Sequence, residues 1–327
     1  MGFAEIKGQD TAVQILKKSI LGNHISHAYI FQGIEGVGKK TTALALAQAL
    51  NCLNFDTSLG GACGECLGCI KVENGNHPDL HIIIPEKYVI KIDQIRSLKS
   101  KVFYKCYEGR KKVIIFDDAH NLTIEASNSL LKVLEEPPQD TVFILVSSEP
   151  GKLPDTIISR CQQIQFQPLS VYTIKEHLIK ENPEKISQIS LAASLAGGSL
   201  AKAEELLAEG EVLENRQETI NFVKKLFELS FSDIIIWCEK WDREKKKVKT
   251  ILEIIQLWYR DLLVFRTTGR EEILINQDHV ADIKNSQHTL ININYALLLI
   301  NESIKNLESN VSPRLVLEVF FMKLKIK

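Results

Sequence analysis

Short apolar runs alternate with helical stretches through the first half of the chain. Several of these runs are apolar throughout, which is typical of strands buried on both faces of a parallel sheet. The clearest helical pattern, residues 125–135, ends before Pro137-Pro138 because proline cannot continue a helix. Alternating β and α segments predict an α/β domain that ends near Pro168. The predicted strands are residues 28–31, 81–84, 113–116, 142–146 and 164–166.

The second half of the chain shows helical patterns and almost no strand signal. Ser170 is a good cap for a helix that starts at Val171, and Gly197-Gly198-Ser199 separates that region from another helix. The final helix is predicted to start at Ser312-Pro313. The pattern therefore predicts three parts: an α/β domain over residues 1–168, a small helical domain over 169–209 and a larger helical domain over 210–327.

Composition restricts the kinds of function that the chain can have. Its 327 residues carry a formal net charge of −1, which argues against a protein that grips DNA by charge alone. Seven cysteines, four of them clustered, indicate metal chemistry in a reducing compartment and not a disulfide framework. The N-terminus lacks a signal region, and no apolar run approaches the roughly 18 residues that span a bilayer. We expect a cytoplasmic protein without membrane contact.

A phosphate-binding loop is indicated between the first strand and the next helix. Residues 33–39 read G-x4-G-K in the strand–loop–helix context that the P-loop motif requires. Its backbone N–H groups and the helix N-terminus would surround phosphate oxygens, and Lys39 would reach the β- and γ-phosphates. The alternative is a Gly-rich turn, which the strand before and the helix after disfavour. The predicted nucleotide-binding residues are Gly33, Gly36, Gly38, Lys39, Lys40, Thr41 and Asp117.

This loop departs from the hydrolytic pattern at one position. Lys40 stands where a Ser or Thr hydroxyl normally binds Mg²⁺, and an ammonium group has no lone pair to offer a metal. Asp117 and Asp118 end the strand 113–116, where the first acid normally holds Mg²⁺ and the second can activate water. Asp118 is one methylene shorter than the usual glutamate, and capping of the next helix is its alternative role. We expect ATP and Mg²⁺ binding to be weak or absent.

Four cysteines have the spacing of a metal site. Cys63, Cys66 and Cys69 form two overlapping C-x2-C steps, and Cys52 lies upstream at the end of the helix after the P-loop. Four thiolates can enclose Zn²⁺ in a tetrahedral site with no open position, so the zinc would be structural. An iron–sulfur cluster is the alternative, although the remaining spacing and the following proline of that motif are absent. The zinc module would cover about residues 52–79.

A stretch after the fourth predicted strand, Ser159-Arg160-Cys161, carries a further candidate residue. Taken alone, Arg160 is an arginine in a surface ion pair. Together with other stretches, however, it makes the chain resemble the delta-prime family of bacterial DNA polymerase III clamp-loader subunits, which belong to the AAA+ class. The stretches that carry the resemblance are His27-Ala28-Tyr29, the P-loop, the four-cysteine insert, His77-Pro78-Asp79, residues 128–138 (NSLLKVLEEPP) and Ser159-Arg160-Cys161.

The resemblance implies a fold and a set of partners. The fold would be an AAA+ domain with a five-stranded parallel sheet and a zinc insert, then a helical lid (169–209) and an oligomerising helical collar (210–327). The partners would be the gamma/tau and delta subunits, the sliding clamp and primer-template DNA. Arg160 would be an arginine finger that reaches the ATP of a neighbouring subunit. Ala201 matches the family's ATP-sensing arginine, and Ser147 or Ser148 is a candidate polar sensor.

Three hypotheses about function follow. The favoured one is a subunit of a DNA replication assembly that supplies Arg160 in trans, hydrolyses little ATP itself and has no polymerase site of its own. The second is a catalytically active ATPase of the gamma/tau kind, which would need Mg²⁺-dependent turnover by the isolated chain. The third is a zinc-dependent nucleic-acid-binding module, which the near-neutral charge disfavours.

Overall fold

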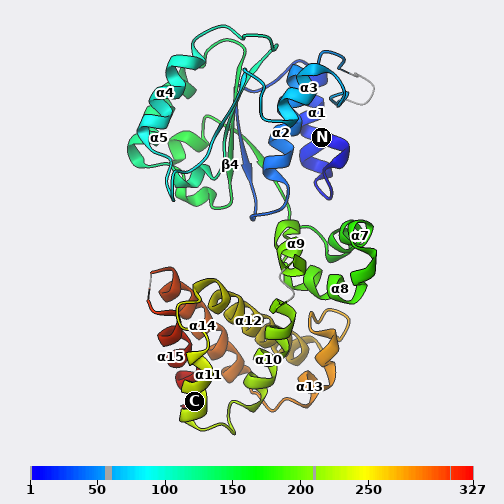
Figure 1. Cartoon of the computed structure of the whole chain (residues 1–327), viewed down its shortest axis with the longest axis vertical. Coiled ribbons are helices and arrows are strands. Elements are labelled where there is room, and N and C mark those ends of the chain that lie inside the picture. The colour runs from blue at the N-terminus through cyan, green and yellow to red at the C-terminus, as the bar shows by residue number, and fades with distance from the viewer. Residues whose placement is uncertain (1, 56–60, 209–210, 310, 327) are drawn as a thin grey trace. The chain divides into compact units, whose positions relative to one another are not determined.

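A computed structural model describes residues 2–55, 61–208, 211–309 and 311–326 of the chain (Figure 1). The contacts within it divide the chain into two compact units. The N-terminal unit comprises Met1–His177 and Gly197–Lys202, and the C-terminal unit comprises Leu178–Ala196 and Ala203–Lys327. Each unit has its own hydrophobic core and is described separately below.

The N-terminal unit is built on a parallel sheet of five strands in the order β2-β3-β4-β1-β5. All five predicted strands are present, with bounds that differ from the prediction by one or two residues. β4 is buried along its whole length, as its uninterrupted apolar sequence predicts. The strands are β1 Ala28–Gln32, β2 Leu80–Ile83, β3 Lys112–Phe116, β4 Thr141–Ser147 and β5 Gln162–Gln165.

Helices cover both faces of this sheet (Figure 1). Helices α1 (Asp10–Leu21) and α2 (Lys39–Asn51) pack on the face that carries Tyr29 and Phe31. Helices α4 (Ile92–Val102) and α5 (Ile124–Glu135) pack on the opposite face with Ile30. Because successive strand residues point to opposite faces, the apolar strands supply both cores at once.

The remaining described elements are helices and 3₁₀ turns, and no strand is described after β5. Two predicted caps are present. The Ser170 hydroxyl oxygen accepts from the Thr173 N–H at 3.0 Å, and that of Ser199 accepts from the Lys202 N–H at 3.2 Å. The other helices are α3 Leu67–Glu73, α6 Asp155–Ile158, α7 Val171–Glu181, α8 Ile186–Leu195, α9 Leu200–Ala208, α10 Glu211–Lys225, α11 Phe231–Glu239, α12 Lys245–Thr268, α13 Val280–Asn285, α14 Leu290–Glu308 and α15 Pro313–Ile326. The 3₁₀ turns are Phe3–Glu5, Ala119–Asn121, Pro150–Lys152, Pro183–Lys185 and Gln277–His279.

The predicted division into residues 1–168, 169–209 and 210–327 stays a prediction. The contacts group α8 with the later helices, whereas the first six residues of the segment 197–208 belong to the N-terminal unit. Residues 209 and 210, where the second predicted boundary falls, lie outside the described residues.

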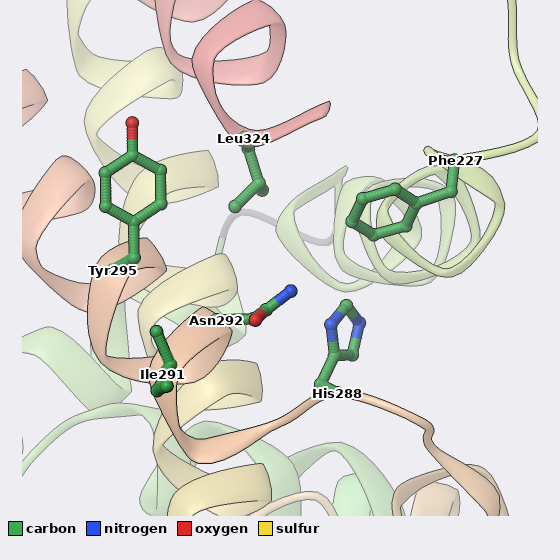
Figure 2. Close-up of a pocket in the computed structure, with 6 residues that line it drawn as sticks. All are labelled: Phe227, His288, Ile291, Asn292, Tyr295 and Leu324. Atoms are coloured by element: carbon green, nitrogen blue, oxygen red, sulfur yellow. The ribbon is translucent and has the colours of Figure 1, made fainter. Parts of the chain in front are cut away.

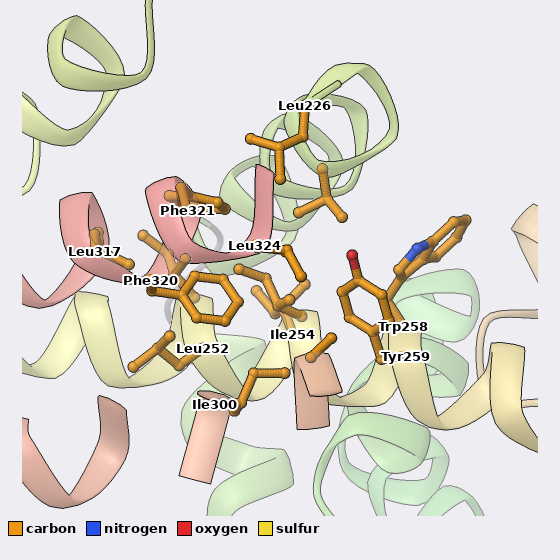
Figure 3. Close-up of a cluster of buried hydrophobic side chains, with 14 of the residues drawn as sticks. Leu226, Leu252, Ile254, Trp258, Tyr259, Ile300, Leu317, Phe320, Phe321 and Leu324 are labelled. Atoms are coloured by element: carbon orange, nitrogen blue, oxygen red, sulfur yellow. The ribbon is translucent and has the colours of Figure 1, made fainter. Parts of the chain in front are cut away.

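The C-terminal unit is held by one large apolar core. Figure 3 shows side chains from α12, α14 and α15 converging on this core, among them Trp258, Ile300 and Phe320, together with Leu226 just after α10. Phe321 lies edge-on to Trp237 of α11, with 5.5 Å between the ring centroids. Burying aromatic side chains of this size contributes strongly to stability, so the core explains why α10–α15 form one unit.

A buried arginine links α10 to the 3₁₀ turn Gln277–His279 of the same unit. The guanidinium of Arg216 donates to both carboxylate oxygens of Asp278 at 2.7 and 2.8 Å, and to the Asn276 side-chain oxygen at 2.7 Å. The Arg216 side chain is only 2% exposed. The Arg216 interaction lowers the pKa of the Asp278 carboxyl group, although burial alone would raise it.

We expect Arg216→Met to destabilise the C-terminal unit by about 2 kcal/mol, because the buried side-chain oxygen of Asn276 keeps its desolvation cost when its donor is removed. All three tryptophans, Trp237, Trp241 and Trp258, belong to this unit, so tryptophan fluorescence during urea unfolding reports on it selectively. The matched control is Lys240→Met, which removes an exposed ion pair to Glu218 and should cost less than about 1 kcal/mol. Equal midpoints for the two variants would contradict the expectation.

Candidate functional site

The predicted P-loop connects β1 to α2 and has the backbone that its glycines predict. Gly33, Gly36 and Gly38 have φ angles of 154°, 74° and 94°, a region that side-chain-bearing residues rarely adopt. A Cβ atom on Gly33 would also lie 2.6 Å from the Phe166 carbonyl oxygen. Glycine is therefore required for conformation at all three positions, and for space at Gly33.

The N-terminus of α9 lies directly on this loop within the N-terminal unit. The Leu200 N–H donates to the Gly36 carbonyl oxygen at 2.9 Å. A Cβ atom on Gly36 would collide with Ser199 and would lie 2.9 Å from the Ala201 methyl group. The position predicted to match an ATP-sensing arginine therefore does adjoin the P-loop, but its alanine offers no charge to a phosphate.

Lys39 is folded back onto the loop. Its ammonium group donates to the carbonyl oxygens of Gly33 at 2.7 Å and Ile34 at 2.6 Å, and the residue is 6% exposed. Burial lowers the pKa of Lys39, while the nearby carboxylates of Asp118, Glu35 and Asp117 act to raise it. A phosphate ligand would have to draw the ammonium away from the two carbonyl oxygens.

Lys40 makes a contact that the sequence did not predict. Its ammonium nitrogen lies 2.8 Å from a carboxylate oxygen of Asp117, at the end of β3. Thr41 is half-buried in the first turn of α2, and the Thr42 hydroxyl donates to the Gly38 carbonyl oxygen at 2.8 Å. Mg²⁺ prefers oxygen ligands, and the Lys40 side chain supplies a cation instead. The residues at this position therefore do not fit a magnesium ion.

Asp118 follows in a left-handed backbone conformation, with φ of 49°. It starts the 3₁₀ turn Ala119–Asn121, and its carbonyl oxygen accepts from the Asn121 N–H at 2.9 Å. Aspartate and asparagine adopt this conformation more readily than most residues. The structure does not test a catalytic role for Asp118, which stays a prediction. The same holds for Ser147, whose hydroxyl oxygen accepts from the Glu149 N–H at 3.2 Å.

The four predicted cysteine ligands meet at one point. The sulfur of Cys52 lies 3.5 Å from that of Cys63 and 3.9 Å from that of Cys66, and the Cys63 and Cys69 sulfurs are 3.9 Å apart. A tetrahedral ion with metal–sulfur bonds of about 2.3 Å separates its ligands by about 3.8 Å. All four sulfurs lie within 4.8 Å of one another, so one metal ion can contact them together. The cysteine cluster therefore fits a metal ion.

Two helices position this cluster. Cys52 caps the C-terminus of α2, and Cys69 lies in the first turn of α3, whose packing is close: a Cβ atom on Gly68 would lie 2.5 Å from the Asn51 carbonyl oxygen. The buried Gln48 side chain donates to the Cys69 carbonyl oxygen at 3.0 Å. The predicted module of residues 52–79 includes residues 56–60, which lie outside the described residues.

The cysteine thiols have uneven acidity because their surroundings differ. Burial raises the pKa of Cys52 and of Cys69. Burial would also raise the pKa of Cys66, but N–H groups of Cys69 and Leu53 and neighbouring thiols lower it to about 6. Backbone N–H groups lower the pKa of Cys63 as well. Thiolates are the metal-binding form, so the two cysteines with lowered pKa values are prepared for a cation.

Asp79, directly before β2, holds the loop before β3 through its carboxylate. Its carboxylate accepts from the N–H groups of Tyr107, Glu108 and Gly109 at 2.7, 3.0 and 2.8 Å. Burial would raise the pKa of Asp79, but these three donors lower it. The resemblance included His77-Pro78-Asp79 without a role for the aspartate. Its observed role is to fix the loop at residues 107–109.

Arg160 lies between α6 and β5 in the N-terminal unit. Its guanidinium donates to the Thr156 carbonyl oxygen at 2.9 Å and to a carboxylate oxygen of Glu135 at 2.8 Å. The side chain is 36% exposed, so it is not sealed inside its own fold. Glu135 belongs to the segment NSLLKVLEEPP, and the sequence analysis did not pair it with Arg160.

Arg160 and the P-loop lie at opposite ends of the neighbouring parallel strands β5 and β1: Arg160 precedes β5, and the P-loop follows β1. Gln162 of β5 is paired with Tyr29 of β1 in a parallel register, so Arg160 lies near the level of His27. The P-loop starts at Gly33, at the carboxyl end of β1. At about 3.3 Å per residue, the interval from 27 to 33 spans about 20 Å. Arg160 therefore cannot contact a phosphate bound by its own P-loop.

One supporting residue of the P-loop had no recognisable signal in the sequence. The buried side chain of Gln9 donates to the carbonyl oxygens of Val37 at 3.3 Å and Gln167 at 2.7 Å, and accepts from the Gln167 N–H at 3.0 Å. It joins the start of α1, the P-loop and the segment after β5. A lone glutamine has no pattern that predicts contacts so far away along the chain.

A pocket in the C-terminal unit contains none of the predicted site residues. Figure 2 shows its lining of mostly apolar and aromatic side chains between α14, α15 and the end of α10. Its volume of ≈ 10 Å³ is about that of one water, which argues against a small-molecule site. The residues that line it are Phe227, His288, Ile291, Asn292, Tyr295 and Leu324.

Comparison with known proteins agrees with this arrangement of motifs. The family described as DNA polymerase III, delta subunit, matches residues 8–170. The DNA polymerase III subunit delta-prime of Bacillus subtilis is 36% identical over 95% of this chain and 94% of its own length. The chain belongs to the delta-prime family of DNA polymerase III subunits. The predicted architecture, an α/β domain on a five-stranded parallel sheet with a four-cysteine cluster and a helical remainder, is confirmed.

Two other similarities are weaker than that to the delta-prime subunit of Bacillus subtilis, the first in coverage and the second in sequence identity. The tau/gamma subunit of Haemophilus influenzae is 37% identical over 69% of this chain, but the match covers only 33% of that subunit. A Thermotoga maritima protein related to the gamma subunit of DNA polymerase III aligns in structure over 96% of this chain and 98% of its own, with 17% identity and a TM-score of 0.44. Within the described residues, no helix has the length and hydrophobicity needed to cross a bilayer.

Proposed function

We propose that this chain serves in the cytoplasm as the delta-prime subunit of a clamp loader. It assembles with gamma/tau- and delta-type subunits and helps ATP-driven loading of a sliding clamp onto primer-template DNA. It contributes Arg160 as an arginine finger to the ATP of a neighbouring subunit. The observation that carries this proposal is the place of Arg160: its side chain is partly exposed, and it lies about 20 Å along the sheet from the chain's own P-loop.

The chemistry of a guanidinium supports the role in trans. An arginine finger stabilises the charge that develops on the transferring phosphoryl group. Besides its hydrogen bond to the Thr156 carbonyl oxygen, Arg160 has one charged partner, Glu135. Another anion can replace this partly exposed contact at small cost, because such ion pairs are worth at most about 1 kcal/mol. A triphosphate on a partner subunit presents several such oxygens. Arg160 is therefore poised to exchange Glu135 for phosphate.

The chain's own pocket supports a subunit that hydrolyses little ATP. Lys39 is engaged with carbonyl oxygens of the loop, and Lys40 is paired with the strand-end acid Asp117. Ala201 supplies no charge beside the loop. These features favour weak or absent ATP binding in this pocket and disfavour an active ATPase of the gamma/tau kind.

We propose further that the four cysteines hold one structural Zn²⁺. The sulfur separations of 3.5–3.9 Å suit a single tetrahedral ion. A cluster of several irons would place more atoms between the thiolates and require wider spacing, which disfavours the iron–sulfur alternative. With four protein ligands, the zinc would have no position for a substrate, so its contribution would be to tie α3 to the end of α2.

Reconstitution tests the proposed function. We expect this chain to co-elute with gamma/tau- and delta-type subunits of the same cell in size-exclusion chromatography. ATP-dependent transfer of a labelled clamp onto primed circular DNA should fall at least about tenfold when the chain is omitted, since the neighbouring ATP site loses its finger. Unchanged loading without the chain would contradict the proposal.

The isolated chain separates this function from the two alternatives. Slow ATP turnover is expected. Rapid Mg²⁺-dependent hydrolysis that Lys39→Ala abolishes would favour an active ATPase of the gamma/tau kind. ATP-independent, salt-dependent binding of the isolated chain to DNA would favour a zinc-dependent nucleic-acid-binding module.

A further inference from the structure

The contact between Lys40 and Asp117 has no counterpart in a working P-loop. Lys40 is the second residue of α2, and Asp117 directly follows β3, so the contact spans the carboxyl edge of the sheet past β4. The ammonium nitrogen and the carboxylate oxygen are 2.8 Å apart, and the Asp117 side chain is only 18% exposed. The Lys40 side chain is 50% exposed, and this short contact ties it to a largely buried acid.

These two residues occupy the positions that normally hold the metal. In P-loop proteins, the hydroxyl of the residue after the P-loop lysine and the acid at the strand end bind Mg²⁺. Here the hydroxyl is replaced by an ammonium group, which offers no lone pair, and that ammonium neutralises the acid. The lysine at position 40 therefore removes one magnesium ligand, the hydroxyl, and occupies the other, the Asp117 carboxylate, in an ion pair.

We propose that the Lys40 ammonium stands in for Mg²⁺, neutralising Asp117 and excluding a divalent cation from this pocket whether or not a nucleoside triphosphate is present. A dication at Asp117 would have to break the ion pair and lie beside the displaced ammonium, which repels it. Where a P-loop protein would have the double positive charge of Mg²⁺, this chain has the single positive charge of Lys40, which is covalently part of the chain.

The other charges of the pocket agree with this assignment. Lys39 is engaged with carbonyl oxygens of the loop, and the carboxylates of Asp118 and Glu35 lie near enough to act on it. With Lys40 and Asp117, the side chains around the loop supply two positive and three negative charges. A triphosphate that enters without a dication therefore meets little net attraction, and we expect its affinity to be low.

This inference rests on the Lys40–Asp117 contact and not on the proposed function. A clamp-loader subunit whose pocket binds Mg²⁺ would contradict the inference and leave the proposed function intact. Conversely, a chain that fails to join a loader could still exclude the metal.

The test is titration of the full chain with a fluorescent ATP analogue, monitored by anisotropy, in excess Mg²⁺ and in EDTA. For the unaltered chain, we expect no strengthening by Mg²⁺ beyond about twofold, whether binding is weak or undetectable. For Lys40→Thr, which supplies a hydroxyl and releases Asp117, we expect Mg²⁺ to strengthen binding at least about tenfold. Lys40→Ser serves as a second variant with the same chemistry.

Two matched variants isolate the cause. Lys40→Met removes the charge without supplying a ligand, so it should gain less Mg²⁺ dependence than Lys40→Thr. The double variant Lys40→Thr/Asp117→Asn should lose the gain. Binding by the unaltered chain that Mg²⁺ strengthens about tenfold or more would overturn the proposal. So would Lys40→Thr and Lys40→Ser variants that fold, by circular dichroism, yet show no Mg²⁺ effect.

Discussion

Arg160→Ala should abolish the ATP turnover that this chain elicits from its partner subunits. Arginine fingers accelerate phosphoryl transfer by about 10³–10⁵, so the neighbouring site should slow by about 10³. The assembled complex should then hydrolyse ATP no faster than a complex from which the chain is omitted. The measurement is steady-state phosphate release by the reconstituted assembly, with size-exclusion chromatography to show that the variant is incorporated.

The control for charge removal is Arg96→Ala on α4. Arg96 is another exposed arginine of the N-terminal unit, paired with Asp93 at 3.3 Å, and it lies outside the proposed finger. Its replacement should leave turnover unchanged. A complex that contains Arg160→Ala and hydrolyses ATP at the normal rate would contradict the finger role.

Glu135→Gln supplies a test in the opposite direction. It keeps the shape of the side chain but removes the charge that holds Arg160 at 2.8 Å. Because a partly exposed ion pair is worth up to about 1 kcal/mol, releasing Arg160 should raise turnover, by up to about fivefold. A simple structural role for the pair would instead predict lower stability and no gain in turnover.

Cys69→Ser should release the metal from the cysteine cluster. Cys69 is fully buried, and its sulfur lies 3.9 Å from that of Cys63. A serine hydroxyl is a much poorer zinc ligand than a thiolate, so metal affinity should fall by more than about 100-fold, beyond the loss caused by changing a residue that only hydrogen-bonds to a ligand. The unaltered chain should carry about one zinc ion, and the variant almost none, by elemental analysis.

The matched control is Cys106→Ser, the same chemical change at a partly buried cysteine outside the cluster. It should keep its zinc. Hydrogen exchange should show faster exchange of the α3 amides in Cys69→Ser and unchanged exchange in Cys106→Ser, because the metal ties α3 to the end of α2. Iron in the unaltered chain, or full zinc retention by Cys69→Ser, would contradict the zinc assignment.

Features that depend on local sequence were predicted well. Strands β1, β3 and β4 were found because each contains a nearly continuous apolar run, and the cap at Ser170 because serine favours that position. β5 reads QQIQ, with one apolar residue, and its predicted start is two residues late. The cysteine cluster was found because three of its ligands lie within seven residues of one another. The conformation of Gly36 followed from the motif itself.

Contacts between side chains far apart in the chain could not be predicted. Lys40 and Asp117 were each identified from the sequence, but their pairing depends on the order of β1, β4 and β3 in the sheet. The pairing of Arg160 with Glu135 depends in the same way on the packing of α6 against α5. Secondary-structure propensity and hydrophobic periodicity describe residues that are neighbours along the chain. They do not predict the order of strands in a sheet or which helices pack together, and these two contacts depend on that order and packing.

The left-handed backbone at Asp118 bears on how such a pocket could change in evolution. A chain that regained hydrolysis would need a hydroxyl at position 40 and a longer acid at position 118. Glutamate tolerates φ of 49° less well than aspartate, since non-glycine residues pay about 1–2 kcal/mol there and only short polar side chains recover part of it through local hydrogen bonds. If the pocket hydrolyses little ATP, as proposed above, a gain of hydrolysis would require remodelling of the turn as well as two substitutions.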